Sequence, residues 1–289
     1  MPSLRQIRRR IRSVQGTGKI THAMEMIAAF RMRQAQARVL AARPYAERIQ
    51  ELVSHLSALV TADEEEALHP LLTEHPRKDR VLVVHVTPDR GLCGGLDSSL
   101  NRFAGEFILK QKPEVAVICV GRKGRDFMQR SGQNIDAVFT DLGHRPSMAD
   151  VLVIANMVVS EYVQNKADEV YLIFSRYISA SSQSPHVLRL LPVQPASLTD
   201  RERAGYIYEP DARQVLAGLL PRFVEREVYQ AILEGIASEQ AARLVAMRNA
   251  TENAQEMIED LTLLMNKVRQ QSITEELLDI VGATQALGG

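Results

Sequence analysis

A heptad repeat of apolar positions runs through the first 60 residues. Steps of three and four residues from Leu4 reach seventeen positions, of which fourteen are apolar, against roughly eight expected from a hydrophobic content of 45%. The positions are Leu4, Ile7, Ile11, Val14, Gly18, Thr21, Glu25, Ala28, Met32, Ala35, Val39, Ala42, Ala46, Ile49, Val53, Leu56 and Val60. A seam sustained for about eight heptads is typical of a coiled coil. We therefore predict one long helix over residues 1–60.

The segment 13–21, SVQGTGKIT, resembles a phosphate-binding loop of the form G-x-x-x-x-G-K-[ST]. Gly18 and Lys19 fit this pattern. Ser13 and Ile20, however, stand where it requires a glycine and a hydroxyl residue. A true loop also follows a strand, whereas the helical seam passes through this segment. We predict helix here and no nucleotide site.

Two irregularities interrupt the seam. Gly18, Thr21 and Glu25 are consecutive polar positions, and a glycine inside a helix costs roughly 1 kcal/mol against alanine. Such a patch predicts a place where the packing partner changes or a turn loosens. Pro44 is expected to kink the helix, or to be tolerated where packing compensates for the lost hydrogen bond.

A second helical pattern occupies residues 211–289 and is punctuated by Pro221. Its seam positions are Met247, Ala250, Ala254, Met257, Leu261, Leu264 and Val268. Matching seams at opposite ends of the chain predict an antiparallel coiled coil, with the residues between them as an inserted domain. The alternative is two separate helices that cover one globular core, but such helices need a wider apolar face.

The middle of the chain alternates between strand and helix patterns. Short β-branched runs predict strands over 80–87, 115–121, 169–175 and 186–193, and helical stretches lie near 97–111, 122–131 and 147–166. This alternation is typical of a Rossmann-like α/β layer. We therefore expect an α/β domain over 80–195, joined to the long helices by a connector over 61–79 and a linker over 196–210.

A glycine-rich turn follows the first of these strands. The segment 87–100, TPDRGLCGGLDSSL, could hold a phosphate at a helix N-terminus. Its glycines do not fit G-x-G-x-x-G, and no acidic residue closes a second strand as a ribose ligand would. We favour a tight strand-to-helix turn capped by Asp97 or Ser98.

The sequence contains no recognisable active site. The seven histidines are scattered, paired cysteine spacing for zinc is missing, and there is no G-x-S-x-G motif. Cys93 and Cys119 are interpreted as reduced cytosolic thiols. No apolar run approaches the roughly 20 residues of a membrane span. We predict no catalytic residue, no cofactor and no metal.

Charge is balanced overall but uneven along the chain. There are 35 basic and 35 acidic residues, yet residues 1–38 hold eight arginines and one lysine against a single acid, Glu25. This basic segment admits two alternatives, a mitochondrial presequence or a coiled-coil binder of nucleic acid. The seam continues without a cleavage-like break, which disfavours the first. The zero net charge and the 5% aromatic content disfavour the second.

Three segments carry a resemblance to one family. Residues 3–36 (SLRQIRRRIRSVQGTGKITHAMEMIAAFRMRQAQ) and 237–281, which contains EQAARLVAMRNATENAQEMIEDLTLLMNKVRQQSITEELLDI, are similar to the two ends of the gamma subunit of F-type ATP synthases. The segment DRGLCGGL (89–96) resembles the glycine loop of that family's middle domain. The resemblance spans essentially the whole chain. One departure is Ala283-Thr284, near where the family's C-terminal signature usually ends in Gly-Ala.

The resemblance implies a rotor shaft without catalysis of its own. Its partners would be the alpha and beta subunits, with one copy per three of each, together with the epsilon subunit and the membrane c-ring. Rotation of the ring by ion flow would drive the beta subunits through their conformations during ATP synthesis or hydrolysis. The family's cysteine-pair insertion is missing, and no transit peptide is convincing. Both point to a bacterial complex at the cytoplasmic face of the plasma membrane.

The resemblance also implies roles for particular residues. The residues expected to contact the beta subunits are Met24, Glu25, Arg243, Arg269, Gln270, Thr274 and Glu276. Those expected to meet the epsilon subunit and the c-ring are Tyr206, Tyr208 and Glu209. The arginine cluster at 8–12 would lie high in the shaft, although a solvated helix face explains it equally well.

Overall fold

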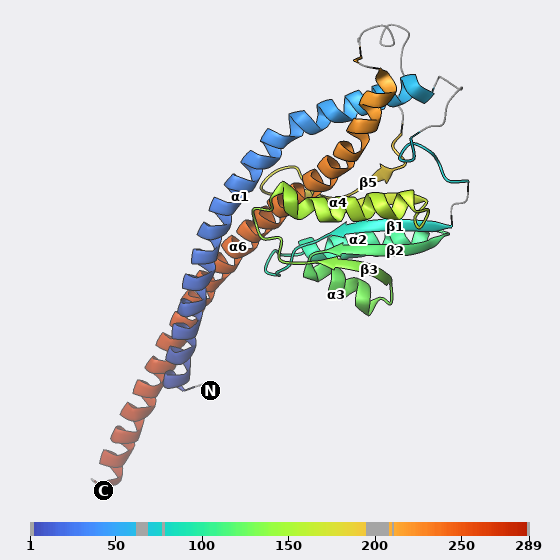
Figure 1. Cartoon of the computed structure of the whole chain (residues 1–289). Coiled ribbons are helices and arrows are strands. Elements are labelled where there is room, and N and C mark those ends of the chain that lie inside the picture. Colours follow the sequence, from blue (N-terminus) through green and yellow to red (C-terminus); the bar gives the residue numbers. More distant parts are fainter. Residues whose placement is uncertain (1–2, 62–68, 77–78, 195–207, 210, 288–289) are drawn as a thin grey trace. The chain divides into compact units, whose positions relative to one another are not determined.

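The computed structural model describes residues 3–61, 69–76, 79–194, 208–209 and 211–287. A long helix lies at each end of the chain, and a five-stranded sheet lies between them in sequence (Figure 1). The chain divides into two compact units. The first holds Met1–Ala28 and Leu244–Gly289, and the second holds Ala29–Arg243. The predicted fold class is confirmed.

The first long helix, α1 (Leu4–Thr61), is continuous through the segment that resembles a phosphate-binding loop. The helical interpretation of that segment is therefore confirmed. Every predicted seam position from Leu4 to Val60 is buried or half-buried, as a helix packed along one stripe requires. Helix α1 also continues through Pro44, which is exposed and removes one backbone hydrogen bond from the helix without ending it.

The second long helix, α6 (Ala212–Leu287), agrees with the predicted seam at five of its seven positions, which are buried or half-buried, and differs at two. Met257 is 47% exposed and Leu264 is 40% exposed. Ile258 and Met265 are half-buried in their place. The buried face still alternates by threes and fours, but between the positions that agree it takes the step of four first, through Thr251, Ile258 and Met265.

The second unit is built around a mixed sheet with the strand order β3-β2-β1-β4-β5. The strands are β1 (Arg80–Val86), β2 (Glu114–Val120), β3 (Asn134–Phe139), β4 (Glu169–Tyr177) and β5 (Gln183–Leu191). The first four run parallel, and β5 pairs antiparallel with β4. The antiparallel β5 and the additional strand β3 differ from the sequence-based expectation.

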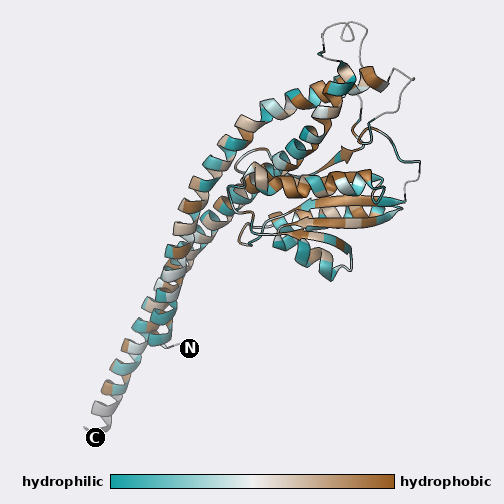
Figure 2. Ribbon diagram, in the orientation of Figure 1, coloured by the Kyte–Doolittle hydropathy of each residue, from teal (hydrophilic) through white to brown (hydrophobic). Residues whose placement is uncertain are grey.

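Helices cover both faces of this sheet. The helices α2 (Leu96–Lys110) and α3 (Arg122–Arg130) bury a cluster that includes Val83, Leu100 and Met128. Helix α4 (Met148–Val163) and the parts of α1 and α6 in this unit share the other, larger cluster. Figure 2 shows hydrophobic residues concentrated in the strands and in α4. The long helices are therefore also part of the core of the α/β unit.

Candidate functional site

In the first unit, the polar seam positions of α1 lie opposite small or polar residues of α6. A Cβ atom added to Gly18 would lie 3.4 Å from the Cβ of Ala254. The hydroxyl oxygens of Thr21 and Thr251 lie 2.8 Å apart. Helix α1 neither breaks nor loses its partner at this patch, so that expectation is wrong. The small and polar residues instead let the two backbones approach closely.

Glu25 is the charged member of this patch. Its carboxylate accepts a hydrogen bond from Nε of Arg248 at 3.1 Å and lies 3.5 Å from Nδ1 of His22, and its side chain is only 15% exposed. Met24, beside it, is half-buried. The order of these contacts, Thr21 with Thr251 and Glu25 with Arg248, makes the pair antiparallel. Arg248 was missed by sequence reasoning because no local pattern links residues 223 positions apart.

Arg243 lies in the second unit and is engaged within the chain. Its guanidinium contacts a carboxylate oxygen of Glu239 at 2.7 Å and donates to the carbonyl oxygens of Arg90 and Gly91 at 3.3 and 3.1 Å. The Arg243 side chain is 11% exposed. Burial raises the pKa of Glu239, and the charge of Arg243 opposes that shift. Arg243 therefore fastens the glycine-rich turn to α6.

The acidic residue of the glycine-rich turn, Asp89, lies at the start of α3 and not at the start of α2, the helix that follows the turn. One carboxylate oxygen of Asp89 accepts the backbone N–H of Arg122 at the start of α3, at 3.0 Å, and the other accepts the N–H of Asp141 at 2.9 Å. An anion at a helix N-terminus would need such N–H groups. The chain's own carboxylate occupies this position.

The predicted cap of α2 is also wrong. The N-cap residue is Gly95, which makes no side-chain capping hydrogen bond. Asp97 lies in the first turn, where its charge suits the helix dipole. The hydroxyl of Ser98 donates back to the carbonyl of Gly95 at 3.0 Å. The tight turn itself agrees with the prediction, because Gly94 has a φ of 62°.

The carboxyl ends of the parallel strands, where doubly wound folds bind ligands, are covered by α6. A Cβ atom added to Gly235 would lie 3.3 Å from a methyl carbon of Val86, so the helix lies directly on the end of β1. The cavity left between these elements measures about 40 Å³. Ligand pockets measure roughly 300 Å³ or more. This place in the fold therefore has no room for a nucleotide.

The predicted tip residues lie on an exposed part of α6. The side chains of Arg269, Gln270, Thr274 and Glu276 are all exposed, and the Thr274 hydroxyl donates to the carbonyl of Gln270 at 2.9 Å. Every side chain described from 273 to 281 is exposed. The large apolar ones are Ile273, Leu277, Leu278, Ile280 and Val281. Apolar residues gathered at such a tip are typical of a contact surface.

The residues expected to meet the epsilon subunit and the ring are only partly described. Tyr206 lies outside the described residues. Tyr208 is half-buried against the large cluster of the second unit, and Glu209 is exposed. Of this group, Glu209 is therefore the described side chain that a partner could reach most easily.

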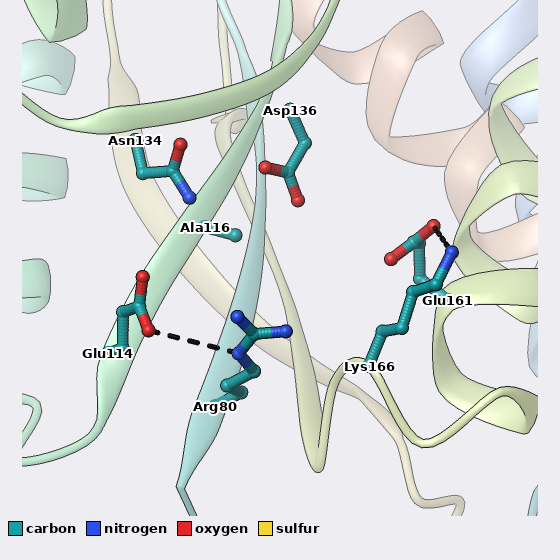
Figure 3. Close-up of a pocket in the computed structure, with 7 residues that line it drawn as sticks. All are labelled: Arg80, Glu114, Ala116, Asn134, Asp136, Glu161 and Lys166. Carbon is teal, nitrogen blue, oxygen red and sulfur yellow. Dashed lines mark hydrogen bonds and ion pairs between the residues drawn. The ribbon is translucent and has the colours of Figure 1, made fainter.

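A charged cluster lies at the amino ends of β1, β2 and β3 (Figure 3). Arg80 lies 3.8 Å from Glu114, and Lys166 lies 3.4 Å from Glu161. Burial and the charge of Glu161 raise the pKa of Asp136, while Arg80 lowers it. The cavity between these side chains measures about 50 Å³, and no metal-binding group occurs among the residues that the structure describes. The mixed charges form ion pairs rather than a site.

Glu227 on α6 makes stability depend on pH. Burial raises its pKa from 4.5 to about 7, with Arg226 opposing the shift and Glu234 adding to it. Between pH 4.5 and about 7, Glu227 keeps its proton in the folded chain but loses it in the unfolded chain. The free energy of unfolding therefore falls as the pH rises through this range. Glu227→Gln is expected to remove this loss, on the order of 2 kcal/mol between pH 5 and pH 8. Urea melts at both pH values test this, with the exposed Glu256→Gln as control, and an unchanged pH slope would contradict it.

Comparisons with known proteins agree on one family. The family model described as ATP synthase matches residues 3–287. The chain is 51% identical over 287 residues to an ATP synthase gamma chain of Dehalococcoides mccartyi strain CBDB1, covering 99% of this chain and 100% of that one. It is 46% identical over 295 residues to an ATP synthase gamma chain of Herpetosiphon aurantiacus, with 99% of each chain covered.

Solved structures show the same fold. A chain of the Euglena gracilis mitochondrial ATP synthase (OSCP/F1/c-ring, rotational state 3) matches with a TM-score of 0.68 at 20% identity, over 98% of this chain and 94% of that one. A chain from the central stalk and c-ring of the Tetrahymena thermophila mitochondrial ATP synthase matches with a TM-score of 0.60 at 24% identity, over 80% and 99%. Among the described residues, no helix combines the length and apolarity that a bilayer span requires.

Proposed function

The chain belongs to the family of ATP synthase gamma chains, and we propose from this premise that it is the central shaft that couples rotation of a membrane ring to the catalytic beta subunits. The observation that carries the proposal is the 51% identity to a gamma chain along 287 residues. The shaft is not an enzyme by itself. The chemistry of ATP belongs to the beta subunits around it.

The partners of the shaft are alpha and beta subunits, an epsilon subunit and a c-ring. One copy of the chain stands in a ring of three alpha and three beta subunits, in keeping with the family resemblance. The complex is attached to the cytoplasmic face of a bacterial plasma membrane. The chain reaches the membrane only through its partners.

The physical task of the shaft is to bind the beta subunits unequally. A ligand shifts a conformational equilibrium only by its difference in affinity for the states. A shaft whose faces differ offers each beta subunit a different contact, so rotation changes the populations in turn. The two helices of the first unit suit this task, because α1 is rich in arginine there and α6 carries most of the unit's acidic residues.

We assign the contacts with the beta subunits to two places. Met24 and Glu25 form one place, on the seam of the first unit. The second is the exposed tip, with Arg269, Gln270, Thr274 and Glu276. We also assign Arg243 of the second unit to these contacts, in keeping with the family resemblance, and within the chain its side chain holds the glycine-rich turn.

We assign the contact with the epsilon subunit and the c-ring to Tyr206, Tyr208 and Glu209. The domain division that goes with this function is a coiled coil of residues 1–60 and 211–289 and an α/β domain of residues 80–195. Residues 61–79 and 196–210 connect them.

Reconstitution tests the proposal. The purified chain is mixed with alpha and beta subunits, and the particle is weighed while its ATPase activity is measured. We expect one copy per three alpha and three beta subunits, and no ATPase activity from the chain alone. Failure to assemble, together with nucleotide binding by the isolated chain, would overturn the proposal.

A further inference from the structure

The end of strand β4 pairs with β5 on one side but extends beyond its pairing with β1 on the other, and there side chains of α6 hold its backbone. Strand β1 pairs with β4 only as far as Ile173. Beyond it, the backbone N–H of Tyr177 donates to Oε2 of Glu234 at 3.0 Å, and the hydroxyl of Ser238 donates to the carbonyl of Ser175 at 2.9 Å. Helix residues four apart rise about 6 Å, and strand residues two apart about 6.6 Å. The helix and the strand therefore match in spacing.

The other oxygen of Glu234 joins this contact to α1. Oε1 accepts hydrogen bonds from Nη2 of Arg43 at 3.0 Å and from Nε2 of Gln230 at 3.1 Å. The Glu234 side chain is 6% exposed. Three elements, α1, α6 and β4, therefore meet at one buried carboxylate, and both of its oxygens are occupied.

A second arginine, Arg226, joins α1 and α6, this time with the side chain on α6 and the acceptor on α1. Arg226 of α6 donates to the carbonyl of Ala42 at 3.2 Å, and its guanidinium carbon lies 4.8 Å from the ring centre of Tyr45 and 5.6 Å from that of Tyr229. Arg43 reaches from α1 to α6, and Arg226 reaches from α6 to α1. The two helices are thus held against sliding past one another.

The contacts that join Arg43, Glu234 and Tyr177 form a junction of three elements. Their energetics suit them to fixing the relative positions of α1, α6 and β4 more than to stabilising the fold. A buried ion pair recovers its desolvation cost only with good geometry, so it adds little to stability compared with apolar packing. Removing one partner, however, leaves an uncompensated buried charge. Small apolar residues around the junction, including Ala35, Ala237 and Ala241, would slide over one another easily without it.

We propose that Glu234 is a positioning residue that keeps α1, α6 and the end of β4 in register when torque passes between the α/β sheet and the shaft. The inference rests on the proposed function as a rotor. It assigns to one buried carboxylate the connection between the part that the ring turns and the part that acts on the beta subunits. Arg43 and Tyr177 supply the other two sides of this connection.

The test compares loaded and unloaded rotation. An assembly of three alpha, three beta and one shaft hydrolyses ATP without load on the α/β sheet, whereas the complete complex in vesicles must drive the c-ring through it. For Glu234→Ala, we expect unloaded hydrolysis to be unchanged and the ratio of protons pumped to ATP hydrolysed to fall by about 2- to 30-fold, the range of mutations that alter coupling. Glu234→Gln, which keeps an acceptor for the Tyr177 N–H, is expected to restore part of this ratio.

Gln240→Ala is the matched control, because Gln240 is also a buried polar residue of α6, at 3% exposure, but takes no part in the hydrogen bonds described above for Glu234 and Ser238. We expect this variant to keep the ratio of the unmodified chain. Equal ratios in Glu234→Ala and Gln240→Ala would overturn the proposal. If the Glu234→Ala variant does not assemble, the Glu234→Gln variant becomes the test. A ratio of protons pumped to ATP hydrolysed equal to that of the unmodified chain would then overturn the proposal. Failure of the unmodified chain to assemble would instead count against the rotor function.

Discussion

Replacing Gly121 with alanine is expected to unfold the α/β unit or to leave it severely destabilised. Gly121 has a φ of 103°, and an added Cβ atom would lie 2.0 Å from the carbonyl oxygen of Thr87. The clash is with backbone, which no rotamer change relieves. Backbone strain of 1–3 kcal/mol and a steric term of similar size predict a loss of roughly 3 kcal/mol or more in the free energy of unfolding.

Gly132→Ala provides the control for this prediction. Gly132 also has a positive φ, 69°, but an added Cβ atom would meet nothing within 4 Å. This variant should lose only the conformational term, about 1–2 kcal/mol. Urea melts followed by circular dichroism compare the two variants. Equal losses would show that the approach of Thr87 to Gly121 does not matter.

Replacing Met24 with lysine is expected to disturb coupling while leaving the fold largely intact. Met24 is half-buried next to Glu25 in the first unit, so a longer cationic side chain can reach solvent from this position. On the proposed assignment, it would form a new ion pair with a beta subunit. A pair worth about 1.4 kcal/mol changes the population of one rotational state tenfold. ATP synthesis should fall by about that factor.

Met26→Lys serves as the comparison, because Met26 lies on the same helix but is 58% exposed. The new charge is the same, and only its place on the helix differs. ATP synthesis and hydrolysis are measured for both variants in the complete complex. A normal rate of ATP synthesis with Met24→Lys would contradict the placement of Met24 against a beta subunit. Equal losses of synthesis in both variants would show that the added charge matters and its position on the helix does not.

The long helices could be predicted from the sequence because their signal is local and repeated. The seam of α1 agrees with the structure at every predicted position, from Leu4 to Val60. In α6 the same reasoning selected Met257 and Leu264, both exposed, because an apolar residue follows each of them in the sequence and the buried face takes Ile258 and Met265 instead. Strand β3 was missed because its side chains alternate between exposed and half-buried, without the buried run that marked β1 and β2.

The contacts that hold the candidate site could not be predicted, because each joins residues distant in the sequence. Nothing near Glu25 indicates Arg248, and nothing near Arg43 indicates Glu234. The glycine-rich turn shows the same limitation. Nothing in its sequence indicates that Asp89 accepts the N–H of Arg122 at the start of α3, or that Arg243 donates to its carbonyl groups. Local patterns specify elements, whereas the chemistry between elements depends on their packing.

The described part of the α/β unit has the layers of a nucleotide-binding fold, but the carboxyl ends of its strands leave a cavity of only about 40 Å³. Helix α6 covers the strand ends at Gly235, Asp89 accepts the N–H of Arg122 at the start of α3, and Arg243 holds the turn. Fold and function separate here, as they do in many α/β proteins. In this chain, the sheet serves as a body to which the two helices are fastened.

Direct observation of rotation tests the central claim. A probe is attached through Leu109→Cys, since Leu109 is 81% exposed on α2 while the native Cys93 and Cys119 are buried. The beta subunits of the assembled particle are fixed to a surface, and ATP is added. We predict one-directional rotation of the probe in steps of about 120°, the angle set by three equivalent partners. A probe that stays fixed while ATP is hydrolysed at the normal rate would contradict the account.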